Sequence, residues 1–95
     1  MMSHKDEYID VLINQVFSLL PTVEKYGFNN DEFVIKQKNL CDKIKGFISI
    51  SNYDTVTSFD ILSYTATLSS IQNHKIYRSR IFRICNLLSS LKGGE

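Results

Sequence analysis

The segment KIYRSRIFRICNLLSSL, residues 75–91, decides the fold of this 95-residue chain. Its large apolar side chains recur at spacings of four, three, four and three residues, which is the repeat of one face of an α-helix. These side chains are Tyr77, Ile81, Ile84, Leu88 and Leu91. Gly93 and Gly94 follow the segment, and glycine commonly ends a helix. The pattern therefore predicts an amphipathic helix over about residues 75–91, with one face buried in a core.

A second stripe of this kind lies near the start of the chain. It consists of Ile9, Leu12, Ile13, Val16, Leu19 and Leu20. Ser3 can cap such a helix, and acidic residues in its first turn favour the positive end of the helix dipole. Pro21 lacks an amide hydrogen and disfavours helical geometry at the preceding residue. We therefore expect a helix over about residues 4–20 that ends or kinks there, followed by a short turn that closes at Gly27.

The next stripe predicts a helix from about residue 31 to residue 46 or a little beyond. Asn29 or Asn30 can cap it. The residues expected along its buried side are Phe33, Gln37, Leu40, Ile44 and Phe47, with Val34, Cys41 and Ile48 beside them. Residues 47–51 alternate briefly with a period of two. No partner strand is evident for them, so we interpret them as a frayed helix end.

A third apolar pattern predicts a helix over about residues 57–72. Thr57 followed by Asp60 is the hydroxyl-then-acid pattern of a capped start. The residues expected to face inward are Phe59, Leu62, Ala66, Leu68 and Ile71. Many of the other residues here are Ser and Thr, which are mediocre helix formers. This helix should therefore depend on packing against its neighbours.

Together these four segments predict a single all-α domain over residues 1–95. Only one proline and four glycines interrupt the chain, so a few long helices are favoured over many short strands. The predicted connections are short, which makes neighbouring helices antiparallel. Two arrangements fit equally well at this point: a four-helix antiparallel bundle, or a stack of helical hairpins.

The charge and hydropathy of the chain argue against a membrane segment. Formal net charge is +1, so no overall field favours nucleic acid or a lipid surface. No apolar run reaches the roughly 18 residues of a membrane span, and the first residues lack the apolar stretch of a signal peptide. We expect a cytoplasmic protein. The charge is unevenly distributed: residues 61–95 contain five of the basic residues and only one acidic residue, Glu95.

No residue pattern in the chain predicts catalysis. Cys41 and Cys85 lie far apart, with no second Cys or His at metal-ligand spacing. His4 and His74 have no nearby Asp or Ser that would suggest a catalytic base, and the chain has no glycine-rich phosphate loop. We therefore expect no catalytic residues, no metal and no cofactor. An enzyme, or a receptor for a small molecule, is not favoured by this sequence.

A basic cluster lies at the start of the last predicted helix, in the positions Lys75, Arg78, Arg80 and Arg83. Cations at a helix start oppose the helix dipole, so an acidic partner could be the reason for them. They could also form an ordinary solvated face. A third possibility is the reading helix of a helix-turn-helix, although the acidic remainder of the chain disfavours nucleic acid.

The chain contains six phenylalanines and five tyrosines, which is a large supply of aromatic side chains for a thin bundle. Phe17 and Phe82 do not fall on the main stripes of their helices. They either complete the core or form an apolar surface for a partner helix. The residues that we expect to contact a partner protein, itself helical or acidic, are Phe17, Tyr77, Arg78, Arg80, Phe82 and Arg83.

The segment LSSIQNHKIYRSRI, residues 68–81, resembles the turn of a tetratricopeptide-type helical hairpin. More narrowly, it is similar to the hairpin of the larger chaperone subunit that holds the needle protein of type III secretion. Residues 41–52 loosely resemble the preceding helix of that family. Lys75 or Ile76 replaces the expected turn glycine, and Arg80 replaces a small residue. The resemblance implies a cytosolic chaperone with a concave apolar face that shields an aggregation-prone helical subunit, aided by a smaller co-chaperone.

Two other functions suit a protein of this kind. A cytosolic four-helix bundle without an active site is also typical of an immunity protein, which neutralises a bacteriocin or toxin by binding it through complementary charge. A small DNA-binding regulator is the third alternative, and it depends on the arginine cluster alone.

Overall fold

The computed structural model describes residues 3–93, and within them all regular structure is helical. The helices are α1 (His4–Phe17), α2 (Leu19–Tyr26), α3 (Asp31–Ile50), α4 (Thr55–Ala66) and α5 (His74–Ser90), with a 3₁₀ turn η1 (Leu68–Ser70) after α4. Because α1 and α2 form one interrupted rod, the chain has the four helical rods that its sequence predicts. No helix in these residues is both long and apolar enough to cross a membrane.

The first rod is interrupted at Ser18, and Pro21 does not end it. The prediction of a turn after Leu20 is wrong, because the helix resumes at Leu19 and continues to Tyr26. Pro21 is tolerated because it stands in the first turn of α2, where amide groups have no partner within the helix. The carbonyl oxygen of Ser18 accepts hydrogen bonds from the Thr22 hydroxyl at 3.0 Å and from the Lys36 ammonium at 3.2 Å.

The predicted caps of the first two rods are confirmed in α1 and α3. The Ser3 hydroxyl accepts a hydrogen bond from the amide of Asp6, and Asn30 Oδ1 accepts one from the amide of Phe33. The helix that begins after Asn30 continues through residues 47–50, so the segment interpreted as a frayed end belongs to α3.

The start and the orientation of α4 differ from the prediction. Asp54 caps this helix, where Thr57 was expected to do so: Asp54 Oδ2 accepts hydrogen bonds from the Thr57 amide at 2.9 Å and the Thr57 hydroxyl at 3.1 Å. The helix therefore begins at Thr55 and turns Ile61 and Thr65 into the core. Phe59, expected inside, is 67% exposed, and Ala66 is exposed as well.

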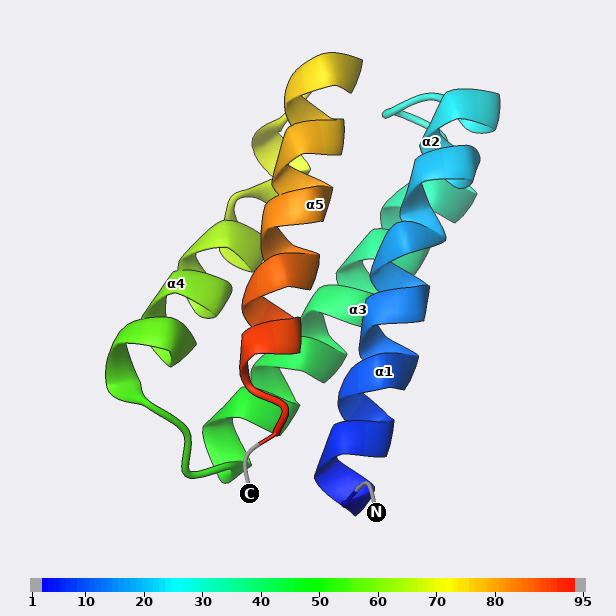
Figure 1. The fold of residues 1–95 in the computed structure, drawn as a ribbon. Helices are drawn as coiled ribbons and strands as arrows, with labels where there is room; N and C mark the ends of the chain where they lie inside the picture. The colour runs from blue at the N-terminus through cyan, green and yellow to red at the C-terminus, as the bar shows by residue number, and fades with distance from the viewer. Residues whose placement is uncertain (1–2, 94–95) are drawn as a thin grey trace.

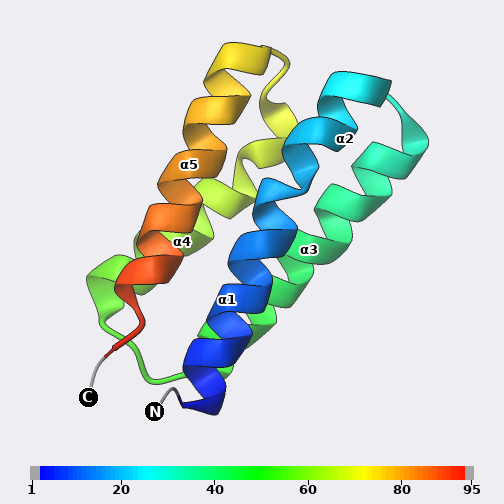
Figure 2. The same ribbon diagram turned by 45° about the vertical axis from the view of Figure 1, so that its right-hand side comes forward.

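The rods form a closed, antiparallel bundle. Figure 1 shows α1 and α4 running in one direction and α3 and α5 in the other. The α1 helix packs on both α3 and α5, and α4 packs on the same two helices, so the first and last rods complete a ring. Figure 2 shows from a second direction that α5 lies beside α1 and α4. Of the two predicted arrangements, this packing is that of a bundle.

The core runs along the inside of the ring. It contains the predicted stripe of α5, in which Tyr77, Ile81, Ile84 and Leu88 are fully buried. The other helices contribute Ile9, Leu12 and Val16 from α1, Leu40 and Ile44 from α3, and Ile61 from α4. One polar pair lies within it, since the Tyr77 hydroxyl donates a 2.6 Å hydrogen bond to Gln37 Oε1. At this end of the bundle, the rings of Phe28 and Phe33 pack edge-on against Tyr77.

Candidate protein-binding surfaces

The structure divides the six residues predicted to bind a partner into three groups. Phe17, Arg78 and Phe82 come together on one side of α5. Arg80 and Arg83 lie on the other side of that helix, against α4. Tyr77 lies in the core between them. The basic cluster seen in the sequence is therefore not a single basic patch.

The first group forms what we call the aromatic–arginine surface, defined by Phe17, Arg78 and Phe82. The Phe17 and Phe82 rings meet edge-on with centroids 5.4 Å apart. The Arg78 guanidinium lies over the Phe82 ring, 5.7 Å from its centroid, and reaches within 4.0 Å of a Glu24 carboxylate oxygen. Phe82 stays 42% exposed despite these contacts. The surface combines accessible aromatic area with a cation, which is the composition of many binding hot spots.

The second group packs within the molecule. The Arg80 guanidinium lies 4.6 Å from the centroid of the Tyr64 ring, and that of Arg83 lies 6.0 Å from the same ring. Arg80 also donates a 3.1 Å hydrogen bond to the hydroxyl of Thr67, the residue that ends α4. A cation is favourable at a helix C-terminus, so Arg80 stabilises the junction of α4 and α5.

The expectation that Tyr77 contacts a partner does not fit its position. Tyr77 is the first member of the α5 stripe, four residues before Ile81, and that spacing places it on the buried face. Burial raises the pKa of its hydroxyl well above the usual value. Its hydrogen bond to Gln37 occupies that hydroxyl. Tyr77 is therefore a core residue.

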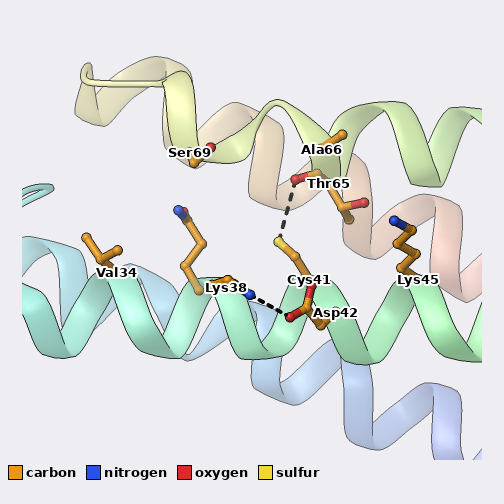
Figure 3. Close-up of a pocket in the computed structure, with 9 residues that line it drawn as sticks. Val34, Lys38, Cys41, Asp42, Lys45, Thr65, Ala66 and Ser69 are labelled. Carbon is orange, nitrogen blue, oxygen red and sulfur yellow. Dashed lines mark hydrogen bonds and ion pairs between the residues drawn. The ribbon is translucent and has the colours of Figure 1, made fainter.

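A groove between α3 and α4 is a further candidate, and the sequence analysis did not identify it. Its volume is about 390 Å³. The lining residues are Val34, Gln37, Lys38, Cys41, Asp42 and Lys45 from α3, and Thr65, Ala66 and Ser69 from the α4–η1 segment. Figure 3 shows Ala66 and Ser69 on the upper wall and the Lys45 amine extending from α3 towards that wall. The groove exists because the α4–η1 wall presents only the small side chains of Thr65, Ala66 and Ser69 to α3.

Two polar contacts lie along the groove, one between its walls and one on the α3 rim. The Cys41 thiol donates to the carbonyl oxygen of Thr65 at 3.5 Å, which ties α3 to the end of α4. Burial, with a smaller contribution from nearby Asp42, raises the pKa of the Cys41 thiol to about 11. Lys38 and Asp42 form a 3.0 Å ion pair on the rim. Because thiolates are the reactive form, Cys41 is a poor nucleophile at neutral pH.

The sequence contained one signal for this groove. Val34, Lys38, Cys41 and Lys45 recur at spacings of four, three and four on α3, which defines a second helix face beside the buried one. That face could not be assigned to a groove without knowing that the small residues of α4 lie opposite.

Titratable groups elsewhere do not gather into a reactive cluster. No group of three His, Cys, Asp or Glu side chains placed to hold a metal ion occurs within residues 3–93. The second thiol, Cys85, is buried, and burial raises its pKa to about 12.

No protein-family model, curated protein or solved structure matches this chain.

Proposed function

We propose that this chain is a cytosolic protein-binding module that contacts its partner through the aromatic–arginine surface. The observation that carries the proposal is the pair formed by Phe17 and Phe82. Their rings support each other in edge contact, yet Phe82 keeps 42% of its area exposed beneath the Arg78 guanidinium. Aromatic and arginine side chains are enriched among the residues that supply most binding energy at protein interfaces.

The charge at this surface favours an acidic, apolar segment as the partner. Arg78 stands near the start of α5, where the helix dipole disfavours a cation, and both Arg78 and Glu24 are largely exposed. An exposed ion pair at 4.0 Å contributes little to stability. A carboxylate from a partner could therefore replace Glu24 at small cost.

The resemblance of residues 68–81 to the needle-subunit chaperone gives this proposal one concrete form. In that form the chain shields an apolar helical secretion subunit, whose hydrophobic face covers Phe17 and Phe82. The expected partner is a protein that aggregates when alone and becomes soluble in the complex.

The immunity protein is the second candidate, and the closed packing of the rods favours it. The first and last rods complete a ring, so the helices enclose a core and do not open into a concave face. A closed bundle that binds through surface charge suits a protein that neutralises a toxin. In this form the partner is a soluble toxin, and the chain protects cells that carry it.

Nucleic acid has less support as a partner. Arg78 faces away from Arg80 and Arg83, and these last two pack on Tyr64. A reading helix needs several base-contacting side chains on one exposed face.

Affinity capture from the native host tests the proposal with matched variants of α5. The test variant combines Phe82→Ser with Arg78→Glu. The control combines Ile76→Ser with Arg83→Glu, which replaces an exposed apolar residue and an arginine on the other side of the helix. We expect one protein to be retained by the wild type and the control and lost from the test variant.

Circular dichroism of both variants must show the wild-type helical content for this comparison to count. The captured protein is then identified, and its solubility alone and its toxicity distinguish the chaperone from the immunity protein. A partner retained equally by both variants would contradict the proposed surface. A salt-sensitive DNA shift lost on changing the three arginines to alanine would replace the proposal with the regulator.

A further inference from the structure

The groove between α3 and α4 continues along α4 as an exposed apolar ridge. Ala66 lines the groove, and Phe59 stands seven residues earlier, which is two helical turns and therefore the same face. Val56 precedes Phe59 by three residues on that face. Phe59 and Val56 are 67% and 68% exposed, so this face buries little of its apolar area within the chain.

The opposite wall of the groove is a matching ridge on α3. Val34, Lys38, Cys41 and Lys45 span eleven residues, or about 16 Å of helix at 1.5 Å per residue. The ridge from Val56 to Ala66 spans about 15 Å by the same rule. The two ridges lie on antiparallel helices that meet at Cys41 and Thr65, so they overlap along part of their length. Two ridges side by side form a groove into which a third helix can pack.

The α3 wall carries two lysines, Lys38 and Lys45, and one carboxylate, Asp42, so its net charge is positive. Lys45 has no carboxylate within 4.0 Å among residues 3–93. Lys38 is paired only with Asp42, four residues further along the same helix, and both side chains are exposed. Such pairs are weak and exchange partners readily. Lys38 and Lys45 are separated by seven residues, so their amines lie two helical turns apart on one edge.

We propose that this groove and ridge dock one helix of a partner protein, about three turns long. Its apolar stripe packs against Phe59 and Ala66, and two acidic side chains about seven residues apart meet Lys38 and Lys45. This is a second docking site, separate from the aromatic–arginine surface, because it lies between α3 and α4 while the latter lies between α1 and α5. The walls select a helix by their spacing, and the lysines select its charge.

Site-specific photo-crosslinking of the full chain in its native host tests the site. A benzophenone amino acid replaces Phe59 on the α4 ridge or Ser69 in the groove. Glu32, on the side of α3 turned away from the groove, serves as the control. The crosslinked peptides are identified by mass spectrometry. We expect both the Phe59 and the Ser69 positions, and not the control, to react with one amphipathic helical segment that carries acidic residues about seven positions apart.

Binding of that segment as a synthetic peptide gives the second measurement. Lys45→Glu should weaken binding by about three- to tenfold, and exchanging the facing acid of the peptide for lysine should restore it. Ala66→Trp fills the groove from an exposed position and should weaken binding by about tenfold or more. Lys43→Glu is the control, because Lys43 lies on the other side of α3 near Gln15. Circular dichroism verifies that each variant is folded.

Several results would overturn this inference. They are crosslinks to a second copy of this chain, crosslinks to nucleic acid, no crosslink above the control, or a segment that is basic or not helical. Unchanged binding by Lys45→Glu together with Ala66→Trp would do the same. None of these outcomes depends on Phe82 or Arg78, so the inference can fail while the proposed function stands.

Discussion

Tyr77 and Gln37 depend on each other within an otherwise apolar core. The Tyr77 hydroxyl is enclosed by the bundle and donates its 2.6 Å hydrogen bond to an amide that is itself only 5% exposed. A buried polar group without a partner costs more free energy than a made hydrogen bond contributes. The pair therefore also fixes the relative position of α3 and α5.

Tyr77→Phe should lower the free energy of unfolding by about 1–2 kcal/mol, because it leaves the Gln37 amide oxygen without its donor. Urea unfolding followed by circular dichroism at 222 nm measures the change. Tyr26→Phe, at an exposed tyrosine, should stay within about 0.5 kcal/mol of the wild type. Adding Gln37→Met to Tyr77→Phe should recover part of the lost free energy of unfolding. If the double variant instead loses the sum of what the two single variants lose, the two side chains do not depend on each other.

The two thiols should make the free energy of unfolding depend on pH in alkali. In the folded chain burial raises the pKa of Cys41 from 9.0 to about 11 and that of Cys85 from 9.0 to about 12. A raised pKa means that the folded state holds its proton more tightly than the unfolded state. The stabilisation is complete below pH 9 and is lost as the pH rises towards 11 and 12.

Above pH 9, the free energy of unfolding should therefore fall by at most about 1.4 kcal/mol per pH unit for each thiol. The double variant Cys41→Ala, Cys85→Ala should show a shallower decline over the same range, because it lacks both thiols. Urea midpoints measured from pH 8 to pH 11 test this. If the urea midpoints of the wild type and the variant fall in parallel with pH, ionisation of the thiols does not affect stability.

At the scale of the element, side-chain caps set where helices begin. Ser3, Asn30, Asp54 and Asn73 each accept a hydrogen bond from the amide three residues later. This satisfies one of the amide groups that every helix start leaves free. Asp54 differs from the others in that it carries a negative charge at the positive end of α4. Its hydrogen bonds from Thr57 lower its pKa below the usual 3.8.

Asp54→Ala should lower the melting temperature by a few degrees, and Asp54→Asn should lower it less, because asparagine still caps. Since the folded pKa is depressed, the charge stabilises the fold above about pH 4, and this contribution is lost as the pH falls through the folded pKa. The advantage of the wild type over Asp54→Asn should therefore vanish in acid. Thermal melts at pH 7 and pH 3 measure it, and an equal difference at both values would exclude a charge effect.

The accuracy of the sequence prediction for each helix follows from how many signals agree. For α5 the apolar period and the terminal glycines agree, and the predicted bounds differ from the observed ones by a single residue at each end. For α4 they conflict, because Phe59 and Ile61 lie two residues apart and cannot share one helix face. Only the packing of α4 against α3 and α5 selects Ile61.

At the scale of the whole molecule, the ring closes through contacts between the most distant parts of the chain. The Cys85 thiol approaches the carbonyl oxygen of Ile13 at 3.8 Å, and the Lys92 ammonium forms a 2.7 Å ion pair with Asp10. Helix periodicity describes one element at a time, so it left the bundle and the stacked hairpins equally open. Spacing puts Arg78 and Arg80 on different sides of one helix, but it could not show which helices they face, or that the small residues of α4 leave a groove beside α3.

Closure of the ring makes the stability of the molecule depend on the α1–α5 contact as a whole. Ile84→Ala removes a fully buried side chain from the α5 stripe and should cost about 2–5 kcal/mol. That is a large part of the roughly 5–15 kcal/mol available to a domain of this size. Ile76→Ala makes the same change at a residue of α5 that is 54% exposed, and should stay within about 0.5 kcal/mol of the wild type.

Urea unfolding of both variants should be followed by helical circular dichroism and by tyrosine fluorescence, since the chain contains no tryptophan. If the ring folds as one unit, both signals give the same midpoint, and Ile84→Ala shifts the two midpoints together. Separate midpoints would mean that one hairpin of the ring melts before the other. The aromatic–arginine surface would then be disrupted, because Phe17 of α1 and Phe82 of α5 meet only where the first and last rods close the ring, whereas the Arg80–Tyr64 contact lies within the α4–α5 hairpin.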